Sequence, residues 1–199
     1  RLPEAVTKIF ACYEQSFFLG VSGKLYACGN NSQGALGLAS LTSVTVPQEV
    51  PLAGVTEVWV NGDYLYAKGS VVFRNAAGYW GCGDNGSGQF GLGHMNAVNT
   101  PTKLAIPLDA KRVALSSRYL LYQAANGSVY YSGSQYPNGG LAGQADTDVF
   151  KPFPVNGVTS MFAGRSRTIF VCGPDLYATG YQISGSLVKS ANFAFTNLS

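Results

Sequence analysis

Short apolar runs, separated by turns rich in Gly, Asn and Ser, follow one another along the whole chain. No stretch keeps the apolar period of an amphipathic helix, which is about 3.6 residues. Short runs with turn signals at even spacing are typical of strands in an all-β protein. The pattern therefore predicts a fold of strands and turns.

The Gly-rich turns recur with a regular period, since their first glycines lie 54, 50 and 47 residues apart. The next glycines follow at five and then three residues in two copies. The third copy is stretched, and the fourth has Val188 where the last glycine would stand. The glycines are Gly29, Gly34 and Gly37; Gly83, Gly88 and Gly91; Gly133, Gly140 and Gly143; Gly180 and Gly185. Because a fixed period marks a structural repeat, we divide the single array of residues 1–199 into units 6–54, 55–110, 111–157 and 158–199.

Each turn lies among further short apolar runs that we interpret as strands. The run directly before the turn spans 25–28, 79–82, 129–132 and 176–179. Two runs precede it: the first begins at 9–10, 58–59, 113–114 and 161–162, and the second spans 17–19, 65–67, 120–122 and 168–171. A proline-led segment leaves the unit at 47–50, 101–104 and 152–155, as a strand start allows. Four short strands per unit with a periodic Gly/aromatic motif predict antiparallel β-propeller blades.

Four small residues occupy one place in the third strand of the units: Cys28, Cys82, Ser132 and Thr179. This pattern predicts a small-residue slot inside each blade rather than a disulfide. We therefore expect reduced thiols and an intracellular protein, cytoplasmic or nuclear. Sequons at Asn30, Asn85, Asn126 and Asn197 do not decide the compartment, because turn chemistry alone produces such triplets.

The segments LYACGNNSQGALGL (25–38) and YWGCGDNGSGQFGLG (79–93) resemble the repeat of the regulator of chromosome condensation family. The resemblance implies a propeller, usually a ring of about seven blades. Four units then make a fragment or a partial (half) propeller that docks against another chain, or a ring that closes with fewer blades. The unpaired edges of an open array would invite association. The family also implies guanine-nucleotide exchange on a small GTPase, and chromatin association in its best-known member; the acidic and wedge elements of that activity have no assignable positions in this chain.

Charge excludes little but disfavours some partners. The chain has 13 Lys and Arg against 10 Asp and Glu, a net charge of +3, and its longest basic run is Lys111-Arg112. Nucleic-acid binding usually shows a basic stripe, so we do not expect it here. No apolar stretch approaches the roughly 20 residues of a membrane span.

Three patterns imitate chemical sites. Gly81 to Gly86 fits G-x-G-x-x-G, but that fingerprint needs a following helix to bind phosphate. The oxygen-bearing side chains from Asp84 to Gln89 lack the acidic density of a calcium loop. His94 is the single histidine and has no G-x-S-x-G elbow beside it. We therefore expect no catalytic residue, metal or cofactor.

The turns between the first and second strands are more informative. Aligning Cys12, Asn61, Ser116 and Gly164 places them on one face of the propeller. Tyr and Arg are enriched at protein-binding hot spots. The candidate protein-binding residues in these turns are Glu14, Asp63, Tyr64, Arg118, Tyr119, Arg165 and Arg167. The alternative is a set of ordinary solvated loops.

Unit two carries five extra residues, which we place in a longer hairpin over Lys68 to Gly78. Phe73 and Arg74 on this hairpin are further candidate contacts with a partner, unless the hairpin packs over a neighbouring blade.

The expected function is a non-catalytic protein-interaction or scaffold module that completes a propeller or complex with another chain. The alternatives are guanine-nucleotide exchange on a small GTPase and an enzyme or inhibitor built on the same scaffold.

Overall fold

The computed structural model describes residues 2–63, 68–134, 144–165, 167–180 and 188–190. The described residues form strands, turns and loops without a helix. Sixteen strands assemble into four separate sheets of four strands each. The predicted all-β fold of four-stranded antiparallel blades is confirmed.

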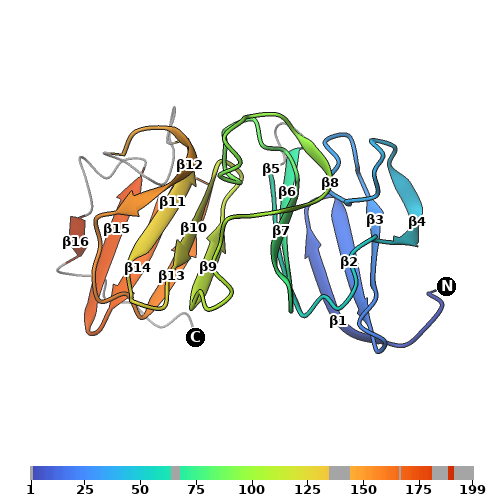
Figure 1. Ribbon diagram of the computed structural model, residues 1–199, viewed down its shortest axis with the longest axis horizontal. Helices are drawn as coiled ribbons and strands as arrows, with labels where there is room; N and C mark the ends of the chain where they lie inside the picture. Colours follow the sequence, from blue (N-terminus) through green and yellow to red (C-terminus); the bar gives the residue numbers. More distant parts are fainter. Residues whose placement is uncertain (1, 64–67, 135–143, 166, 181–187, 191–199) are drawn as a thin grey trace, which may run out of the picture.

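Each sheet is one blade, numbered here in chain order (Figure 1). Blade 1 contains β1 (Val6–Cys12), β2 (Gln15–Gly20), β3 (Leu25–Gly29) and β4 (Val44–Glu49). Blade 2 contains β5 (Glu57–Asp63), β6 (Lys68–Asn75), β7 (Gly78–Gly83) and β8 (Val98–Lys103). Blade 3 contains β9 (Arg112–Leu115), β10 (Tyr119–Gln123), β11 (Val129–Gly133) and β12 (Thr147–Phe153). Blade 4 contains β13 (Ser160–Ala163), β14 (Arg167–Cys172), β15 (Asp175–Gly180) and β16 (Val188–Ser190). Every sheet falls inside one of the four expected units, whose exact boundaries stay a prediction.

The strands of a blade are hydrogen-bonded in chain order, and every pair is antiparallel. The blades stand face to face in a row, and the first strands β1, β5, β9 and β13 contact one another in succession (Figure 1). In such a meander the β1–β2 turn and the β3–β4 loop lie at one end of the blade, and the β2–β3 turn lies at the other. We call the first end the loop face.

The core lies between the blades. Three apolar clusters fill the three junctions. Phe17 and Phe73 meet edge-on in the first, with ring centroids 5.8 Å apart. Tyr122, Tyr130 and Phe150 contribute to the second. Phe153 and Phe170 stack in the third, with centroids 5.1 Å apart. Each interior blade therefore buries both of its faces, and alternating side chains supply the two.

Two sequence-based expectations about blade 2 are wrong. Its second strand is Lys68–Asn75, not 65–67. The extra residues lie between Asn61 and Ser70, which pair with each other as Cys12 pairs with Gln15. The insertion therefore lengthens the β5–β6 hairpin, not a hairpin over 68–78. Two adjacent apolar runs competed for one strand, and the second contains Val71, which is buried in a junction.

Blade 4 also differs from its expected alignment. Val188 pairs with Ala178 in the fourth strand instead of occupying the place of a turn glycine. The equivalent pair in blade 1 is Ala27 with Gln48. Gly185, Gly140 and Gly143 lie outside the described residues.

Candidate protein-interaction site

The Gly-rich loops are held by a buried asparagine. In blade 1 the Asn31 side chain accepts a hydrogen bond from the Leu36 amide (2.9 Å) and donates one to the Ser40 carbonyl (2.7 Å). Asn85 makes the same two bonds in blade 2, with Phe90 N (3.0 Å) and His94 O (2.8 Å). Both asparagines are fully buried. The repeated Asn is thus a structural residue, and in blade 2 this same residue, Asn85, is the asparagine of the second sequon.

Each of these loops reaches across to the next blade. The Ala39 amide donates to the Asn99 carbonyl on β8, and the Gly93 amide donates to the Asp148 carbonyl on β12 (2.9 and 2.8 Å). A Cβ on Gly34 would lie 2.5 Å from the Asn99 Cα, so only glycine allows this approach. The motif glycines therefore mark the contact between blades as well as the turn.

The predicted small-residue slot receives the same loop. Cys82 Sγ donates to the Ala35 carbonyl (3.1 Å), and Ser132 Oγ donates to the Gly88 carbonyl (2.6 Å). Burial raises the pKa of the Cys82 thiol, which therefore stays a neutral donor. All four cysteines are free.

The two ends of the row expose the faces that the interior blades bury. We identify counterparts by register: Gln15, Ser70, Tyr119 and Arg167 pair with the first motif glycine of their blades. Two residues further along the second strand, Phe17, Val72 and Leu121 are all 0% exposed. Ile169, their counterpart in blade 4, is 38% exposed. Phe162, beside it on β13, is also exposed.

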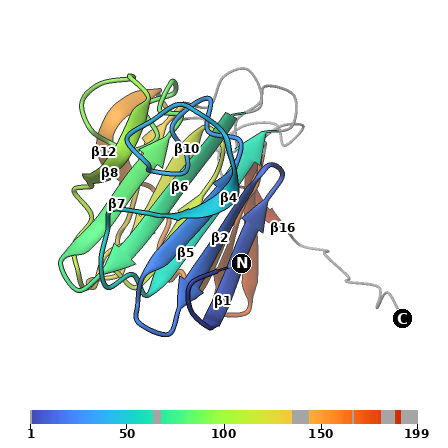
Figure 2. The ribbon, with the colours of Figure 1, turned by 90° about the vertical axis from the view of Figure 1, so that its right-hand side faces the viewer.

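Blade 1 shows the same contrast on its opposite side, which Figure 2 views from outside. Ile9 is 66% exposed, whereas its counterparts Val58 and Met161 are 7% and 8% exposed and the third, Val113, is half-buried. Phe18 pairs with Ile9 and is half-buried, although Phe73 and Phe170 at the same register are fully buried. Because blades stack by their faces, the ends of the row expose sheet faces as well as the unpaired edges that the sequence suggested.

We call these surfaces the end faces, defined by Ile9 and Phe18 on blade 1 and by Phe162 and Ile169 on blade 4. Sequence reasoning missed these four residues. Alignment of the strands by register, rather than of the turns alone, would have found them.

The loop face holds most of the candidates chosen from sequence. Glu14 is exposed and accepts a hydrogen bond from Asn30 Nδ2 (2.7 Å). Arg165 is exposed on the β13–β14 turn, Arg167 is exposed at the start of β14, and Arg118 is half-buried on the β9–β10 turn. Tyr64 and the Asp63 side chain lie outside the described part. The binding role of these residues stays a prediction.

Three candidates are not on an exposed loop face. Tyr119 is 0% exposed, and its hydroxyl donates to the Gly164 carbonyl (2.8 Å) and accepts from Thr168 Oγ1 (2.8 Å). Phe73 is also 0% exposed, because it fills the first junction. Arg74 lies at the other end of the blade, where it pairs with Glu57 (2.9 Å) and lies over the Tyr79 ring. Tyr119 and Phe73 are core residues, and they cannot contact a partner directly.

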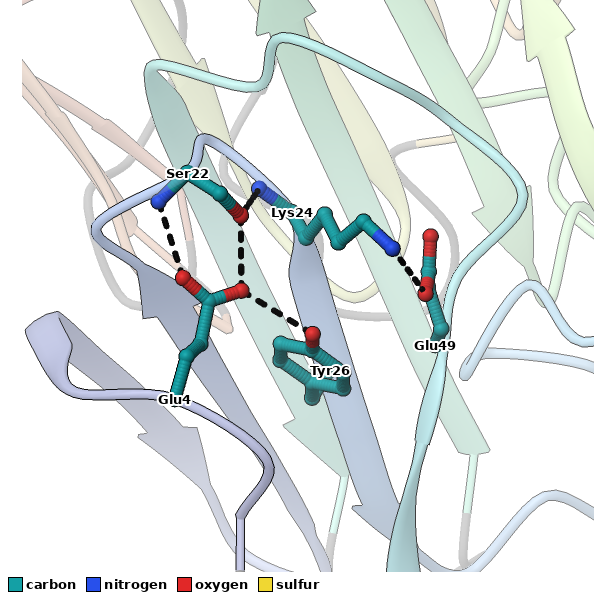
Figure 3. Close-up of polar contacts among 5 residues, drawn as sticks. All are labelled: Glu4, Ser22, Lys24, Tyr26 and Glu49. Carbon is teal, nitrogen blue, oxygen red and sulfur yellow. Dashed lines mark hydrogen bonds and ion pairs between the residues drawn. The ribbon is translucent and has the colours of Figure 1, made fainter.

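A polar cluster at the β2–β3 turn fastens the segment before β1 to blade 1 (Figure 3). The Glu4 carboxylate accepts hydrogen bonds from Ser22 N (2.8 Å), Ser22 Oγ (2.7 Å) and Tyr26 OH (2.9 Å). The bonds from Ser22 lower the pKa of Glu4. Lys24 pairs with Glu49 nearby (3.0 Å). Each carboxylate is hydrogen-bonded or paired with a cation at the surface of the blade, which indicates a structural fastening rather than a reactive centre.

The described residues contain no group of His, Cys, Asp or Glu arranged to hold a metal. Asp84 is buried within its loop, and its side chain accepts a hydrogen bond from the Gly86 amide. His94 Nδ1 accepts a hydrogen bond from the Asn96 amide on an exposed loop. Within the same described ranges, no helix is long and apolar enough to cross a membrane.

These features define an array of β-propeller blades joined by Gly-rich loops. The "Regulator of chromosome condensation (RCC1) repeat" matches residues 22–60, so the resemblance found in the sequence is confirmed. The matched residues run from the β2–β3 turn of blade 1 into β5 of blade 2.

Solved propellers support the fold. Human WBSCR16 has a TM-score of 0.69 and 19% identity over 90% of this chain and 48% of its own. Yeast RCC1 (Prp20), in a crystal with Kap60, has a TM-score of 0.72 and 17% identity over 90% of this chain and 44% of its own. Prp20p from Saccharomyces cerevisiae, described together with its binding to Gsp1p and histones, has a TM-score of 0.68. Its identity is 18% over 90% of this chain and 46% of its own. The chain spans less than half the length of these proteins.

Proposed function

We propose that the chain is a non-catalytic protein-interaction module whose end faces are covered by further propeller blades of a partner polypeptide. The observation that carries this proposal is the exposure of Ile169, at a register where three counterparts are 0% exposed. Ile9 provides the same evidence at the other end of the row.

The energetics favour covering these faces. Burial of an exposed Ile or Phe side chain gains roughly 1.5–3 kcal/mol. Ile9, Phe162 and Ile169 are all large and exposed, so each end face offers a gain of this kind. The three junctions inside the chain supply the type of surface that fits: another four-stranded sheet with an apolar face. Large exposed apolar patches generally mark interaction sites.

Purification of the tagged chain from its source cells, followed by quantitative mass spectrometry, tests the proposal. We expect a co-purifying polypeptide with blades of the same type. Ile9→Asp should reduce its recovery about tenfold or more, because an unpaired charge would be buried at the contact. Val21→Asp is the matched control, since Val21 is 64% exposed on the β2–β3 turn, outside the strands β1 and β2 that carry Ile9 and Phe18. Equal recovery with both variants, or wild-type chain that leaves its source cells without any such polypeptide, would refute the proposal.

A second candidate function is guanine-nucleotide exchange on a small GTPase. Its support is the similarity in fold to Prp20p, which was described with its binding to Gsp1p. The exposed Arg165 and Arg167 lie on the loop face that such a partner would contact. If the purified complex accelerates nucleotide release and Arg165→Glu abolishes the effect, exchange replaces the scaffold function. An unchanged release rate eliminates this candidate.

The four free cysteines support a compartment with reduced thiols, so we place the module in the cytoplasm or nucleus. Imaging of the tagged protein tests this assignment.

A further inference from the structure

Two junctions of the chain share a two-point contact between a Gly-rich loop and the blade after it. One point is the slot residue, Cys82 or Ser132, which donates to a loop carbonyl. The other is the carbonyl of the second residue of the fourth strand, Asn99 or Asp148, which accepts from a loop amide. We call this pair of contacts the loop clamp.

Blade 1 carries both receiving positions of the clamp. Cys28 pairs with Ser16 just as Cys82 pairs with Val71, and Thr45 follows Val44 as Asn99 follows Val98. Cys28 is half-buried and Thr45 is exposed. They border the end face that includes Ile9 and Phe18. The receiving half of a clamp therefore lies beside an uncovered apolar face.

The connection between β15 and β16 in blade 4 is too short to supply the loop half of the clamp. The connection from β3 to β4 spans residues 30–43, and that from β7 to β8 spans 84–97. The connection from β15 to β16 comprises only residues 181–187, half that length. Ala39 and Gly93, which donate to the fourth strand, each stand ten residues after the first motif glycine. A connection of seven residues has no tenth position. A second copy of this chain consequently fails to provide the clamp.

We propose that the end face of blade 1 is a docking site for a blade of a partner polypeptide that carries a full-length Gly-rich loop. The proposal deepens the proposed function and rests on it, because it specifies which blade end the partner presents. Cys28 Sγ donates to a carbonyl of that loop, and the Thr45 carbonyl accepts an amide from it. The residue facing Thr45 must be glycine, since a Cβ at the equivalent positions Gly34 and Gly88 would lie 2.5 and 2.8 Å from the facing Cα.

A loop graft tests the site with the chain alone, in the absence of its partner. Residues 181–187 are replaced by a copy of residues 84–101, so that blade 4 gains a full-length loop and Val188 follows it at the register of Thr102. We expect the grafted chain to associate head to tail in light scattering, while the wild-type chain does not. Alkylation of Cys28 by iodoacetamide, followed by mass spectrometry, should slow by about tenfold on association. Cys12 and Cys172 lie three residues from Ile9 and Ile169 on the same strands, and therefore on the opposite sheet faces, so they should react as before.

The control is the same graft with valine in place of the copied Gly88, which should remain monomeric. A grafted chain that folds but stays monomeric, or that associates without protecting Cys28, overturns the docking site. Wild-type association that protects Cys28 would show that a second copy is the occupant and would overturn the partner-blade assignment.

If the graft prevents folding, the complex with the natural partner decides. Cys28→Ser keeps a donor of the type found at Ser132 and should retain the partner, whereas Cys28→Phe fills the slot and should release it. Equal retention by both variants overturns the clamp. The module function survives that result if Ile9→Asp still releases the partner, so the two proposals fail separately.

Discussion

Cys82 Sγ donates a hydrogen bond to the carbonyl oxygen of Ala35, 47 residues earlier in the chain, at a distance of 3.1 Å. This contact joins the Gly-rich loop of blade 1 to the third strand of blade 2. Ser132 repeats it one blade further on, with the Gly88 carbonyl. The glycine motif that reveals the repeat in the sequence is therefore also what joins neighbouring blades.

The effect of replacing Cys82 on stability should depend on the size of the new side chain and on whether it can donate a hydrogen bond. Cys82→Ser keeps a small donor, as blade 3 has at Ser132, and we expect a change in unfolding free energy of about 1 kcal/mol or less. Cys82→Phe should destabilise by about 1–3 kcal/mol or more, because the slot is fully buried. Urea unfolding measures both variants. Equal losses of unfolding free energy in the two variants would contradict a slot that accepts only small residues.

Gly88→Val should be destabilising for two reasons. Its φ is 74°, which L side chains rarely adopt, and its Cβ would lie 2.8 Å from the Asp148 Cα. Backbone strain alone costs on the order of 1–3 kcal/mol. Gly157→Val is the control, because Gly157 has a φ of 69° and no atom within 4 Å of its Cβ position. Gly88→Val should have the lower melting temperature of the two variants, because only its side chain clashes with the neighbouring blade. Identical melting temperatures would argue against the loop contact.

Truncation of an aromatic residue should cost much more stability in a junction than on an end face. We expect Phe73→Ala to lower the unfolding free energy by about 3–5 kcal/mol, since it leaves a cavity between blades 1 and 2. Phe162→Ala on the end face of blade 4 should cost much less, because Phe162 is 61% exposed. Chemical denaturation of the isolated chain provides the comparison. A larger loss at Phe162 would mean that this face is already covered.

Tyr119 should make stability fall at high pH. Burial raises its pKa to about 12 from the usual value near 10. The unfolded chain then loses this proton at a lower pH than the folded chain, so unfolding becomes more favourable as the pH rises from 10 to 12. The stabilisation is complete below pH 10 and is lost as the pH passes the folded pKa.

Tyr119→Phe provides the comparison in a pH series of urea unfolding. It should flatten the decline and lower stability by roughly 1–3 kcal/mol at neutral pH, because the Gly164 and Arg167 carbonyls lose a donor. An unchanged slope between pH 10 and 12 would exclude Tyr119 as the titrating group.

The repeat and the blade were predictable because glycine spacing and short apolar runs are local signals. The position of β6 was not, because 65–67 and 71–73 are adjacent apolar runs, and the burial of Val71 and Phe73 in the first junction distinguishes the second run. Tyr119 and Phe73 were taken for surface residues for a related reason. The sequence shows their residue type but not the neighbouring blade that covers them.

The end faces could not be predicted from turns alone. Ile169 has the same apolar character as Leu121, and it differs only in lacking a blade beside it. That difference is a property of the assembled row. It becomes visible in the sequence only when strand registers are aligned.

The central claim is that further blades cover the end faces. Hydrogen exchange of the purified chain, compared with the same chain in its natural complex, tests this claim most directly. We predict added protection in residues 6–20 and 160–172, which form the end faces, and little change in β10 and β11 of the interior blade 3. Protection confined to the loop-face turns around Glu14, Arg118 and Arg165, with the end faces unchanged, would contradict the account.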